Sequence, residues 1–412
     1  MNKTARTTRD LYSGFEVIDG DLAVGGVPLT RLAARVGTTP FFAYDRHLLT
    51  ERIATLRRHL PAEINLSYAV KANPMPAVVQ HLAGLVDGFD VASAGELKTV
   101  LDTEMSPERV SFAGPGKRSN ELEQALAAGV TLNVESIGEL EKLAEAGNAL
   151  GMIPRVCLRI NPDFDLRAAG MRMGGGAKQF GIDSEAAPAV LGRVKELGVE
   201  FLGFQIFAGS QNLNAQAICE TQAQIIDLAI ALSKHAPTAV RQLNMGGGFG
   251  IPYFPNDQAL DLRVIGGALT EQMTRVRERL PEARVVLELG RYIVGETGIY
   301  VCRIVDRKVS RGQVFLVTDG GLHHHLAATG NFGQVVRRNF PVAVGNRLNG
   351  SAEESVTVVG CLCTPLDLLA DNVELPKAEE GDFIVIFQSG AYAMTASPHD
   401  FLGHPAPVEV LL

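Results

Sequence analysis

Lys71 is the residue whose position suggests chemistry most directly. It ends a short apolar run that includes Tyr68 and Val70, which we interpret as a buried strand. Lysine is rarely buried without a partner, and burial lowers the pKa of its ammonium group. The neutral amine is a nucleophile that attacks aldehydes to form Schiff bases. The alternative interpretation is a lysine at a strand end whose ammonium reaches solvent.

Short apolar runs alternate with amphipathic stretches from about Pro61 to Gly295, which predicts parallel strands joined by helices. Eight such units, over a length near ~250 residues, predict a (β/α)8 TIM barrel. A doubly wound sheet is the alternative, but no Gly-x-Gly-x-x-Gly follows the first strand. The predicted strands are Asn65–Val70, Phe89–Ala92, Val110–Ala113, Leu132–Val134, Val156–Ile160, Phe201–Ala208, Leu243–Met245 and Val285–Leu289.

The rhythm changes after about Gly298, where strand patterns alternate with Gly-rich and polar turns. This pattern predicts a C-terminal antiparallel β domain over residues 298–412. We assign residues 41–297 to the barrel. Residues 1–40 form an N-terminal segment that we expect to pack on the β domain and join its sheet. The strands predicted in the β domain are Tyr300–Val309, Val314–Asp319, Ser355–Val359 and Phe383–Phe387.

Composition excludes several classes of protein. A net charge of −8 and an acidic isoelectric point argue against nucleic-acid binding. No apolar run is long enough to span a bilayer, so no membrane partner is expected. The five cysteines are scattered and odd in number, which does not fit a disulfide framework. We therefore expect a protein of the reducing cytoplasm.

The ends of the predicted barrel strands carry charged or Gly-rich groups, and barrel active sites lie at these ends. Each group alone has an ordinary structural interpretation. Three glycines make a tight turn, Glu288 and Arg291 form an ion pair, and Phe207 is core. Their arrangement on six strand ends instead favours one shared site. Besides Lys71, the ends carry Asp90, Arg159, Phe207 to Ser210, Gly246 to Gly248, and Glu288 to Arg291.

These residue types fit a pyridoxal phosphate ligand. Gly246–Gly248 exposes backbone N–H groups that can hold a phosphate, and Arg291 and Ser210 can add hydrogen bonds to it. Glu288 follows an apolar strand, where a carboxylate can keep a pyridine nitrogen protonated. Phe207 can stack on the ring.

Several motifs together resemble the fold-type III pyridoxal-phosphate decarboxylases, the group of ornithine, diaminopimelate and arginine decarboxylases whose barrel is shared with alanine racemase. The resemblance runs in order from about Phe41 to the C-terminus. The motifs are Tyr68–Asn73, Phe89–Ser93, Gly246–Gly250, Glu288–Arg291, Cys363 with Asp367, and Gly390–Tyr392.

The resemblance implies Lys71 as the Schiff-base lysine and Glu288 as the partner of the pyridine nitrogen. It implies a homodimer with shared active sites, in which Cys363 of the partner subunit reprotonates the product carbanion. The implied cofactor-binding residues are Lys71, Asp90, Arg159, Phe207, Ser210, Gly246, Gly247, Gly248, Glu288, Gly290, Arg291 and Tyr392. The implied substrate-binding residues are Cys363, Thr364, Asp367 and Tyr392. The alternative interpretations are a small buried hydrophobe for Cys363 and a core tyrosine for Tyr392.

The chain departs from the family pattern at informative positions. Phe207 stands where the family has a histidine that stacks on the cofactor. Glu288–Arg291 reads Glu-Leu-Gly-Arg instead of Glu-Pro-Gly-Arg, and the acid before the three glycines is Asn244. Diaminopimelate enzymes carry an acid after the cysteine, whereas Thr364 follows Cys363 here, which argues against diaminopimelate as the substrate.

Asp319–Gly333 resembles a subgroup tied to secondary metabolism and exopolysaccharide clusters. That subgroup includes the butirosin-pathway decarboxylase, which acts on glutamate loaded on an acyl carrier protein. The segment contains three histidines, His323 to His325. They are consecutive and lack the i, i+4 spacing of a helical metal pair, so we expect no metal site. Arg337 and Arg338 are either contacts for a carrier arm or a solvated pair.

The predicted activity is a pyridoxal-phosphate-dependent α-decarboxylation of an amino acid or amino-acyl thioester. Diaminopimelate decarboxylation is the first alternative. A racemase of the same fold is another, although racemases need a second base, commonly a tyrosine, on the opposite face. A non-enzymatic cofactor carrier is the last, and the extra β domain argues against it.

Overall fold

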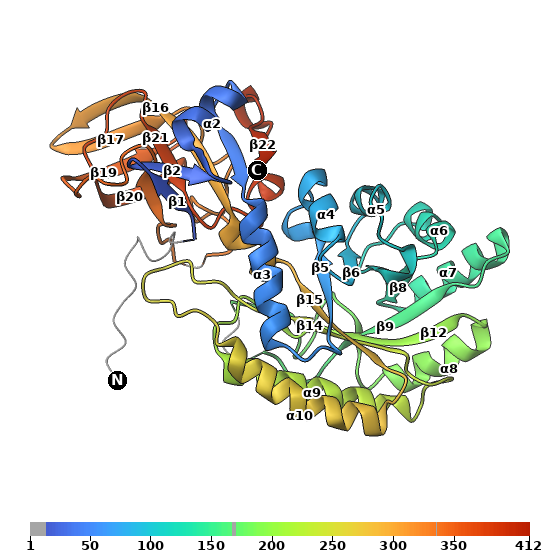
Figure 1. The fold of residues 1–412 in the computed structure, drawn as a ribbon. Coiled ribbons are helices and arrows are strands. Elements are labelled where there is room, and N and C mark those ends of the chain that lie inside the picture. Colours follow the sequence, from blue (N-terminus) through green and yellow to red (C-terminus); the bar gives the residue numbers. More distant parts are fainter. Residues whose placement is uncertain (1–13, 167–169, 335) are drawn as a thin grey trace. The chain divides into compact units, whose positions relative to one another are not determined.

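The computed structural model describes residues 14–166, 170–334 and 336–412 (Figure 1). The chain divides into two compact units. The barrel unit consists of residues 52–251 and 259–292. The β unit consists of the described residues up to Glu51, residues 252–258 and residues 293–412.

Eight parallel strands close into a barrel in the order β5-β6-β7-β8-β9-β12-β14-β15, and β15 pairs back with β5 (Figure 1). The predicted TIM barrel is therefore confirmed. Its strands are almost wholly buried, as expected when side chains fill the inside and helices cover the outside. The strands are β5 (Asn65–Ala69), β6 (Gly88–Val91), β7 (Val110–Phe112), β8 (Thr131–Val134), β9 (Arg155–Asn161), β12 (Glu200–Ile206), β14 (Gln242–Gly247) and β15 (Arg284–Leu289).

Helix starts follow from capping residues in the sequence. The hydroxyls of Ser93 and Ser136 accept the N–H groups of Glu96 and Glu139, which begins α5 and α7 directly after their strands. The helices are α3 (Arg46–His59), α4 (Pro76–Ala83), α5 (Ala94–Leu101), α6 (Ser119–Ala128), α7 (Ile137–Leu150), α8 (Ala187–Leu197), α9 (Ala215–Ser233), α10 (Leu262–Arg279) and α11 (Arg291–Val294).

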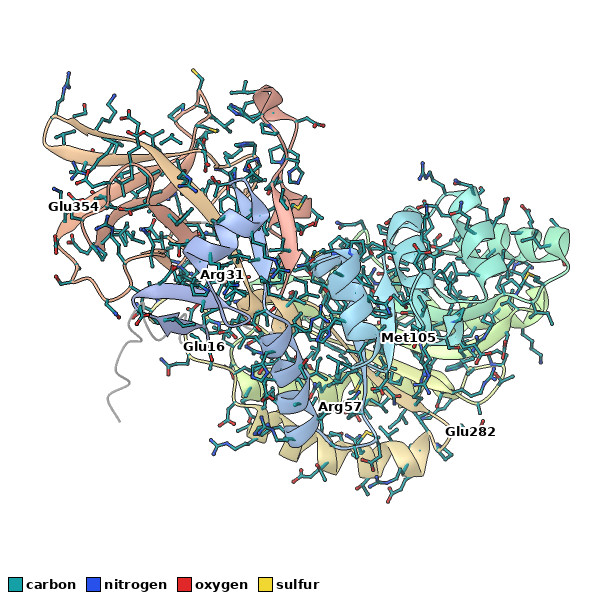
Figure 2. All side chains as sticks on the ribbon, turned by 45° about the horizontal axis from the view of Figure 1, so that its top comes forward. Glu16, Arg31, Arg57, Met105, Glu282 and Glu354 are labelled. Atoms are coloured by element: carbon teal, nitrogen blue, oxygen red, sulfur yellow. The ribbon has the colours of Figure 1, made fainter. Side chains whose placement is uncertain are left out.

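Contacts at the strand starts connect α3 to the barrel. Figure 2 shows Arg57 on α3, and its guanidinium lies 2.6 Å from Asp87 Oδ2. The same carboxylate oxygen accepts the N–H of Leu66 at 2.7 Å. Asp87 thereby joins the helix to the start of β5.

The β unit contains a sheet ordered β18-β21-β16-β17-β19-β20. Its pairs are mostly antiparallel, but β17 pairs with β19 in parallel, and so the sheet is mixed where we expected a purely antiparallel one. The long connection between β17 and β19, which includes β18, allows this parallel pairing. The strands are β16 (Gly298–Ser310), β17 (Gln313–Thr318), β18 (Val342–Val344), β19 (Glu354–Val359), β20 (Leu368–Leu375), β21 (Phe383–Ile386) and β22 (Val408–Leu411).

The N-terminal strand that joins this sheet is β4 (Phe41–Tyr44), which pairs with β16 and, in parallel, with β22. It lies at the start of the range that we assigned to the barrel. The preceding strands β1 (Glu16–Ile18), β2 (Asp21–Val24) and β3 (Val27–Pro28) form a small sheet of their own. With α2 (Leu29–Val36) they pack on the large sheet through one apolar core that includes Leu22, Leu32, Phe41 and Val385.

None of the helices in the described part of the chain is both long and apolar enough to cross a lipid bilayer.

Candidate active site

Lys71 lies in a single 3-10 turn, Val70–Ala72, directly after β5. Its side chain is 41% exposed, and so the expectation of a buried lysine is wrong. The strand ends at Ala69, so Lys71 lies one turn beyond the buried strand. What sets Lys71 apart from an ordinary surface lysine is therefore the charge around its ammonium group and not burial.

Two buried carboxylates face Lys71. Its Nζ lies 3.6 Å from Glu288 Oε1 and 3.9 Å from Asp90 Oδ2. Glu288 belongs to β15 and Asp90 to β6, the two strands that flank β5 in the barrel. The closed sheet thus places three titratable groups from three neighbouring strand ends at one point.

Glu288 keeps its negative charge although it is buried. Burial alone raises the pKa of a carboxyl group, but Lys71, Gln205 and Arg159 together bring the pKa of Glu288 below its usual value. The amides of Gln205 and Asn244 donate to Glu288 Oε2 at 2.9 and 3.3 Å. An ionised carboxylate is the form required to hold a pyridine nitrogen protonated.

Asp90 behaves in the opposite way. Burial raises the pKa of Asp90 well above its usual value, and the negative charge of Glu288 raises it further. Ser111 donates to Asp90 Oδ1 at 2.8 Å, which offsets only part of this effect. The pKa of Asp90 is raised and that of Glu288 is lowered, so the pair carries one negative charge, located on Glu288.

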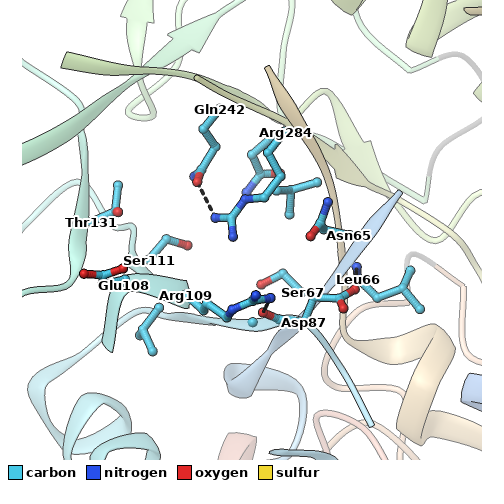
Figure 3. Close-up of a pocket in the computed structure, with 14 residues that line it drawn as sticks. Asn65, Leu66, Ser67, Asp87, Glu108, Arg109, Ser111, Thr131, Gln242 and Arg284 are labelled. Carbon is cyan, nitrogen blue, oxygen red and sulfur yellow. Dashed lines mark hydrogen bonds between the residues drawn. The ribbon is translucent and has the colours of Figure 1, made fainter. Parts of the chain in front are cut away.

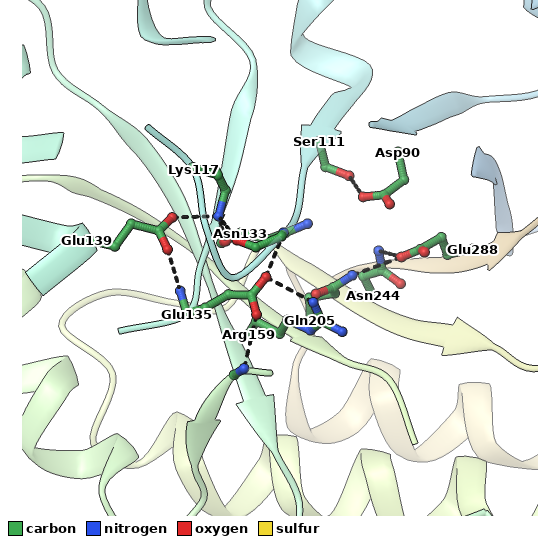
Figure 4. A network of polar contacts seen from close by, with 12 residues as sticks. Asp90, Ser111, Lys117, Asn133, Glu135, Glu139, Arg159, Gln205, Asn244 and Glu288 are labelled. Atoms are coloured by element: carbon green, nitrogen blue, oxygen red, sulfur yellow. Dashed lines mark hydrogen bonds and ion pairs between the residues drawn. The ribbon is translucent and has the colours of Figure 1, made fainter. Parts of the chain in front are cut away.

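A second polar network lies beside this pair (Figure 4). Arg159 is 7% exposed and contacts Glu135 at 2.9 Å. Glu135 also accepts the N–H groups of Gly114 and Gly181. Arg159 is therefore fixed by a carboxylate of its own, and its charge lowers the pKa of both Asp90 and Glu288.

The glycine segment at the end of β14 approaches its neighbours closely. A Cβ atom on Gly246, whose φ is +62°, would lie 2.4 Å from the Phe207 ring. A Cβ on Gly247 would meet the Glu288 carbonyl at 2.3 Å, and one on Gly248 the Gly209 carbonyl at 2.5 Å. Only glycine fits such approaches, which brings the backbone of three strand ends together.

Not every glycine in this segment offers a hydrogen-bond donor. The N–H of Gly246 already donates to Asn244 Oδ1 at 2.8 Å. Gly246 therefore gives space to Phe207 rather than a phosphate-binding N–H, which differs from the role that we predicted for it. Asn244 positions the segment and also contacts Glu288, so one amide connects the two parts of the site.

The remaining predicted barrel residues lie on neighbouring strand ends. Ser210 lies in the short strand β13 (Gly209–Ser210), just after β12. Arg291 begins α11 directly after β15. A Cβ on Gly290 would meet the Ala72 side chain at 2.9 Å, so this glycine lets the turn that carries Lys71 pack closely.

The other predicted residues, Cys363, Thr364, Asp367 and Tyr392, belong to the β unit. Cys363 is an exposed free thiol. Asp367 is 3% exposed, and its carboxylate accepts the N–H groups of Leu322 and Leu362. These contacts favour a positioning role for Asp367 rather than direct substrate binding.

Sequence reasoning missed the contributions of Gln205, Asn244 and Glu135. Gln205 and Asn244 interrupt apolar strands, and an uncharged amide in the middle of a buried strand is the signal that could have indicated them. Glu135 follows β8, a strand end that contributes no residue to the predicted site.

A small cavity lies at the opposite ends of the barrel strands, lined by residues such as Asn65, Asp87 and Arg284 (Figure 3). Its volume is about 20 Å³. This is room for about one water molecule, so a substrate does not fit there.

The arrangement fits pyridoxal phosphate. Lys71 supplies an amine, Glu288 an ionised carboxylate for the ring nitrogen, and Gly246–Gly248 a backbone surface on which any side chain would collide with its neighbours. This donor set and this shape meet the separate needs of an aldehyde, a pyridine nitrogen and a phosphate.

Comparisons with known proteins agree with this chemistry. Residues 46–295 match the family model of the pyridoxal-dependent decarboxylases, in its pyridoxal-binding domain. The L-glutamyl-[BtrI acyl-carrier protein] decarboxylase of Niallia circulans is 36% identical over 90% of this chain and 88% of its own. Diaminopimelate decarboxylase of Aquifex aeolicus is 30% identical over 96% and 92%.

A solved structure shows the same fold. Diaminopimelate decarboxylase from Helicobacter pylori, crystallised with L-lysine, superposes with a TM-score of 0.82 at 25% identity, over 93% of this chain and 94% of that one. The site geometry, the family match and these relatives lead to one conclusion. The chain belongs to the pyridoxal-dependent decarboxylases of fold type III, and it is a carboxy-lyase that uses pyridoxal 5'-phosphate.

Proposed function

We propose that this enzyme removes the α-carboxylate of glutamate held as a thioester on an acyl carrier protein. The observation that carries the proposal is the segment Cys363–Asp367. Thr364 follows the cysteine where diaminopimelate enzymes have an acid. Both oxygens of Asp367 are occupied by the backbone N–H groups of Leu322 and Leu362, at 2.6 and 2.8 Å. This segment thus offers no free carboxylate to a distal ammonium group.

A glutamyl thioester has no distal ammonium and does not need that carboxylate. The Niallia circulans relative, which is named for a carrier-bound glutamyl substrate, supports the same choice. Arg337 is half-buried, and its guanidinium donates to the carbonyls of Thr329 and Leu368, so it fixes the loop that follows the histidines rather than reaching for a substrate. Arg338 is then the better candidate for contact with a carrier arm.

The residues divide the reaction among them. Pyridoxal phosphate, when bound, supplies an electron sink for the electron pair left behind as CO₂ departs. Lys71 would provide the amine that holds the cofactor, and Glu288 would keep a proton on its ring nitrogen. Phe207 would cover the ring, while Gly247, Gly248, Ser210 and Arg291 would bind the phosphate. Cys363 of the partner subunit gives a proton to Cα, which completes the exchange of CO₂ for H⁺.

We also propose a homodimer in the cytoplasm. The family resemblance assigns Cys363 to the partner's site, and its thiol is exposed in the β unit. All five cysteines lie in the described part of the chain and are free, which suits a reducing compartment.

The test is CO₂ release from the cofactor-loaded enzyme with a panel of substrates. The panel holds glutamyl thioester on a carrier protein, glutamyl pantetheine, free glutamate, meso-diaminopimelate, lysine, ornithine and arginine. We expect release from the thioesters alone. Release from diaminopimelate instead would establish the alternative function in lysine biosynthesis. Lys71→Ala is the control, and turnover by this variant would overturn the assignment of the lysine.

A further inference from the structure

The three consecutive histidines differ sharply in their surroundings. His324 Nε2 lies 2.9 Å from the Pro405 carbonyl, so this nitrogen carries the proton, and Tyr300 donates to Nδ1 at 3.0 Å. His325 Nδ1 accepts the N–H of Ala328, and its Nε2 donates to Ser389. Both rings therefore use both of their nitrogens in ordinary hydrogen bonds.

His323 is different. It is 0% exposed, and neither ring nitrogen has a hydrogen-bond partner among the described residues. A buried polar group without a hydrogen-bond partner lowers the stability of the fold by about 1–3 kcal/mol. Such groups are rare in native proteins. A side chain of this kind indicates a ligand that the protein residues alone do not provide.

Two further metal-binding side chains surround the His323 ring. The ring centroids of His323 and His404 are 5.2 Å apart, and Cys361 Sγ lies 3.8 Å from His404 Nδ1. One ligand atom from each of the three residues lies within 4.8 Å of the other two. Two imidazoles and one thiolate at such spacing match the ligands of Zn²⁺.

The backbone holds these ligands in place independently of a metal. Asp367 accepts the N–H of Leu322, next to His323, and the N–H of Leu362, next to Cys361. One buried carboxylate thus fixes two of the three ligand segments. Cys361 also lines a hollow of about 760 Å³ on the β unit.

We propose that His323, Cys361 and His404 bind a Zn²⁺ ion, with a water molecule as the fourth ligand. This proposal replaces the expectation of no metal site. That expectation treated the three histidines as one set, whereas the structure singles out His323 and adds partners distant in the sequence. The site lies within the β unit and does not depend on the proposed substrate.

Protonation states are consistent with the site. Burial, with a smaller effect of His404 and His399, lowers the pKa of His323 to about 4, so its ring is neutral and able to bind at neutral pH. Burial and the charge of Asp367 raise the pKa of Cys361 to about 11. The thiol proton must therefore leave as the Zn–S bond forms, and binding weakens as the pH falls.

The site has a consequence for the segment that carries Cys363. Cys361 is two residues before Cys363 and six before Asp367. A metal ion at Cys361 would connect this segment to the histidine turn and to His404 near the C-terminus. The ion is then a structural element that joins the histidine turn, residues 323–325, to the segment with the exposed thiol and positions that thiol.

The experiment uses the full-length holoenzyme. Bound zinc is measured by mass spectrometry after exposure to Zn²⁺ and gel filtration, and Co²⁺ is used in place of zinc as a spectroscopic probe. We expect one zinc per chain, a thiolate-to-cobalt charge-transfer band and the visible bands of tetrahedral Co²⁺. Cys361→Ser removes the charge-transfer band, and His404→Gln lowers the zinc content. Cys219→Ser, the same change on α9 of the barrel unit, alters neither.

Two results would overturn the site. The first is wild-type protein that keeps no more zinc than the Cys361→Ser variant. The second is a cobalt spectrum without a thiolate band. The second measurement needs no variant, so a Cys361→Ser protein that fails to fold would not prevent the test.

Discussion

The barrel site and the histidine turn of the β unit both bury titratable groups, but they do so in opposite ways. At the barrel site, Glu288 keeps its negative charge because it faces Lys71, whereas the neighbouring Asp90 is protonated. In the histidine turn, burial lowers the pKa of His324 and His325 to about 3, and the rings remain neutral. A carboxylate next to a lysine can stabilise positive charge on a ligand, whereas a neutral imidazole is suited to hydrogen bonding or metal binding.

Glu288→Gln has the largest expected effect, because it removes the one negative charge of the Glu288–Asp90 pair beside Lys71. We expect kcat to fall by about 10²- to 10³-fold, the loss typical of a group that stabilises developing charge. The measurement is the steady-state CO₂ release of enzyme whose cofactor content is checked by absorbance. Asp90→Asn is the matched control, since Asp90 is the carboxyl that we infer to be protonated. Equal losses in the two variants would contradict the unequal roles of the pair.

Lys117→Met tests whether charge pairing supports the barrel as well as its chemistry. The Lys117 ammonium is buried and contacts Glu139 at 2.6 Å and the carbonyls of Gly114 and Asn133 (Figure 4). Removing one partner of a buried ion pair costs about 3–5 kcal/mol, because the other charge stays buried. We expect a marked fall in Tm by calorimetry. The double variant Lys117→Met with Glu139→Leu should recover part of the loss, and no recovery would argue against a charge effect.

Tyr300→Phe is the corresponding change in the histidine turn. It removes the hydroxyl that donates to His324 Nδ1 and leaves a buried acceptor without a donor. The expected cost is about 1–3 kcal/mol, smaller than that of the broken ion pair, because no charge is left alone. Thermal unfolding at one pH measures it. A loss of stability as large as that of Lys117→Met would contradict the proposed difference between charged pairs in the barrel and neutral hydrogen bonds in the histidine turn.

The pH dependence of stability tests whether Asp90 is protonated in the folded protein. The folded-state pKa of Asp90 is raised, so above pH 3.8 the unfolded chain loses this proton while the folded chain keeps it. Stability therefore falls as the pH rises toward the folded pKa, by at most about 1.4 kcal/mol per pH unit. In Asp90→Asn this contribution disappears. We expect the Tm of the variant to fall less than that of the wild type between pH 5 and pH 8.

The control for this measurement is Asp102→Asn, the same substitution at an exposed position. It should leave the pH profile of Tm unchanged. Parallel profiles for Asp90→Asn and the wild type would mean that Asp90 is ionised in the folded protein, and that the pair carries two negative charges.

The sequence by itself determined the barrel and the grouping of Lys71, Asp90 and Glu288 at one rim of it. Strand–helix periodicity indicates all eight strands, and the carboxyl ends of parallel strands must share one rim, so Lys71, Asp90 and Glu288 could be grouped before any contact was known. Local signals such as Ser93 and Ser136 mark where helices begin. These features depend on short-range periodicity and on one general rule of topology.

Tertiary structure alone decided the details that depend on distant residues. The exposure of Lys71, the unequal pKa directions of Asp90 and Glu288, and the pairing of β4 with β16 all arise from contacts between remote segments. His323 shows this most clearly. In the sequence it is one of three equal histidines, but folding gives its two neighbours hydrogen-bond partners and places His323 beside Cys361 and His404. The reason is physical, because burial and pairing depend on distances in space that residue spacing along the chain does not encode.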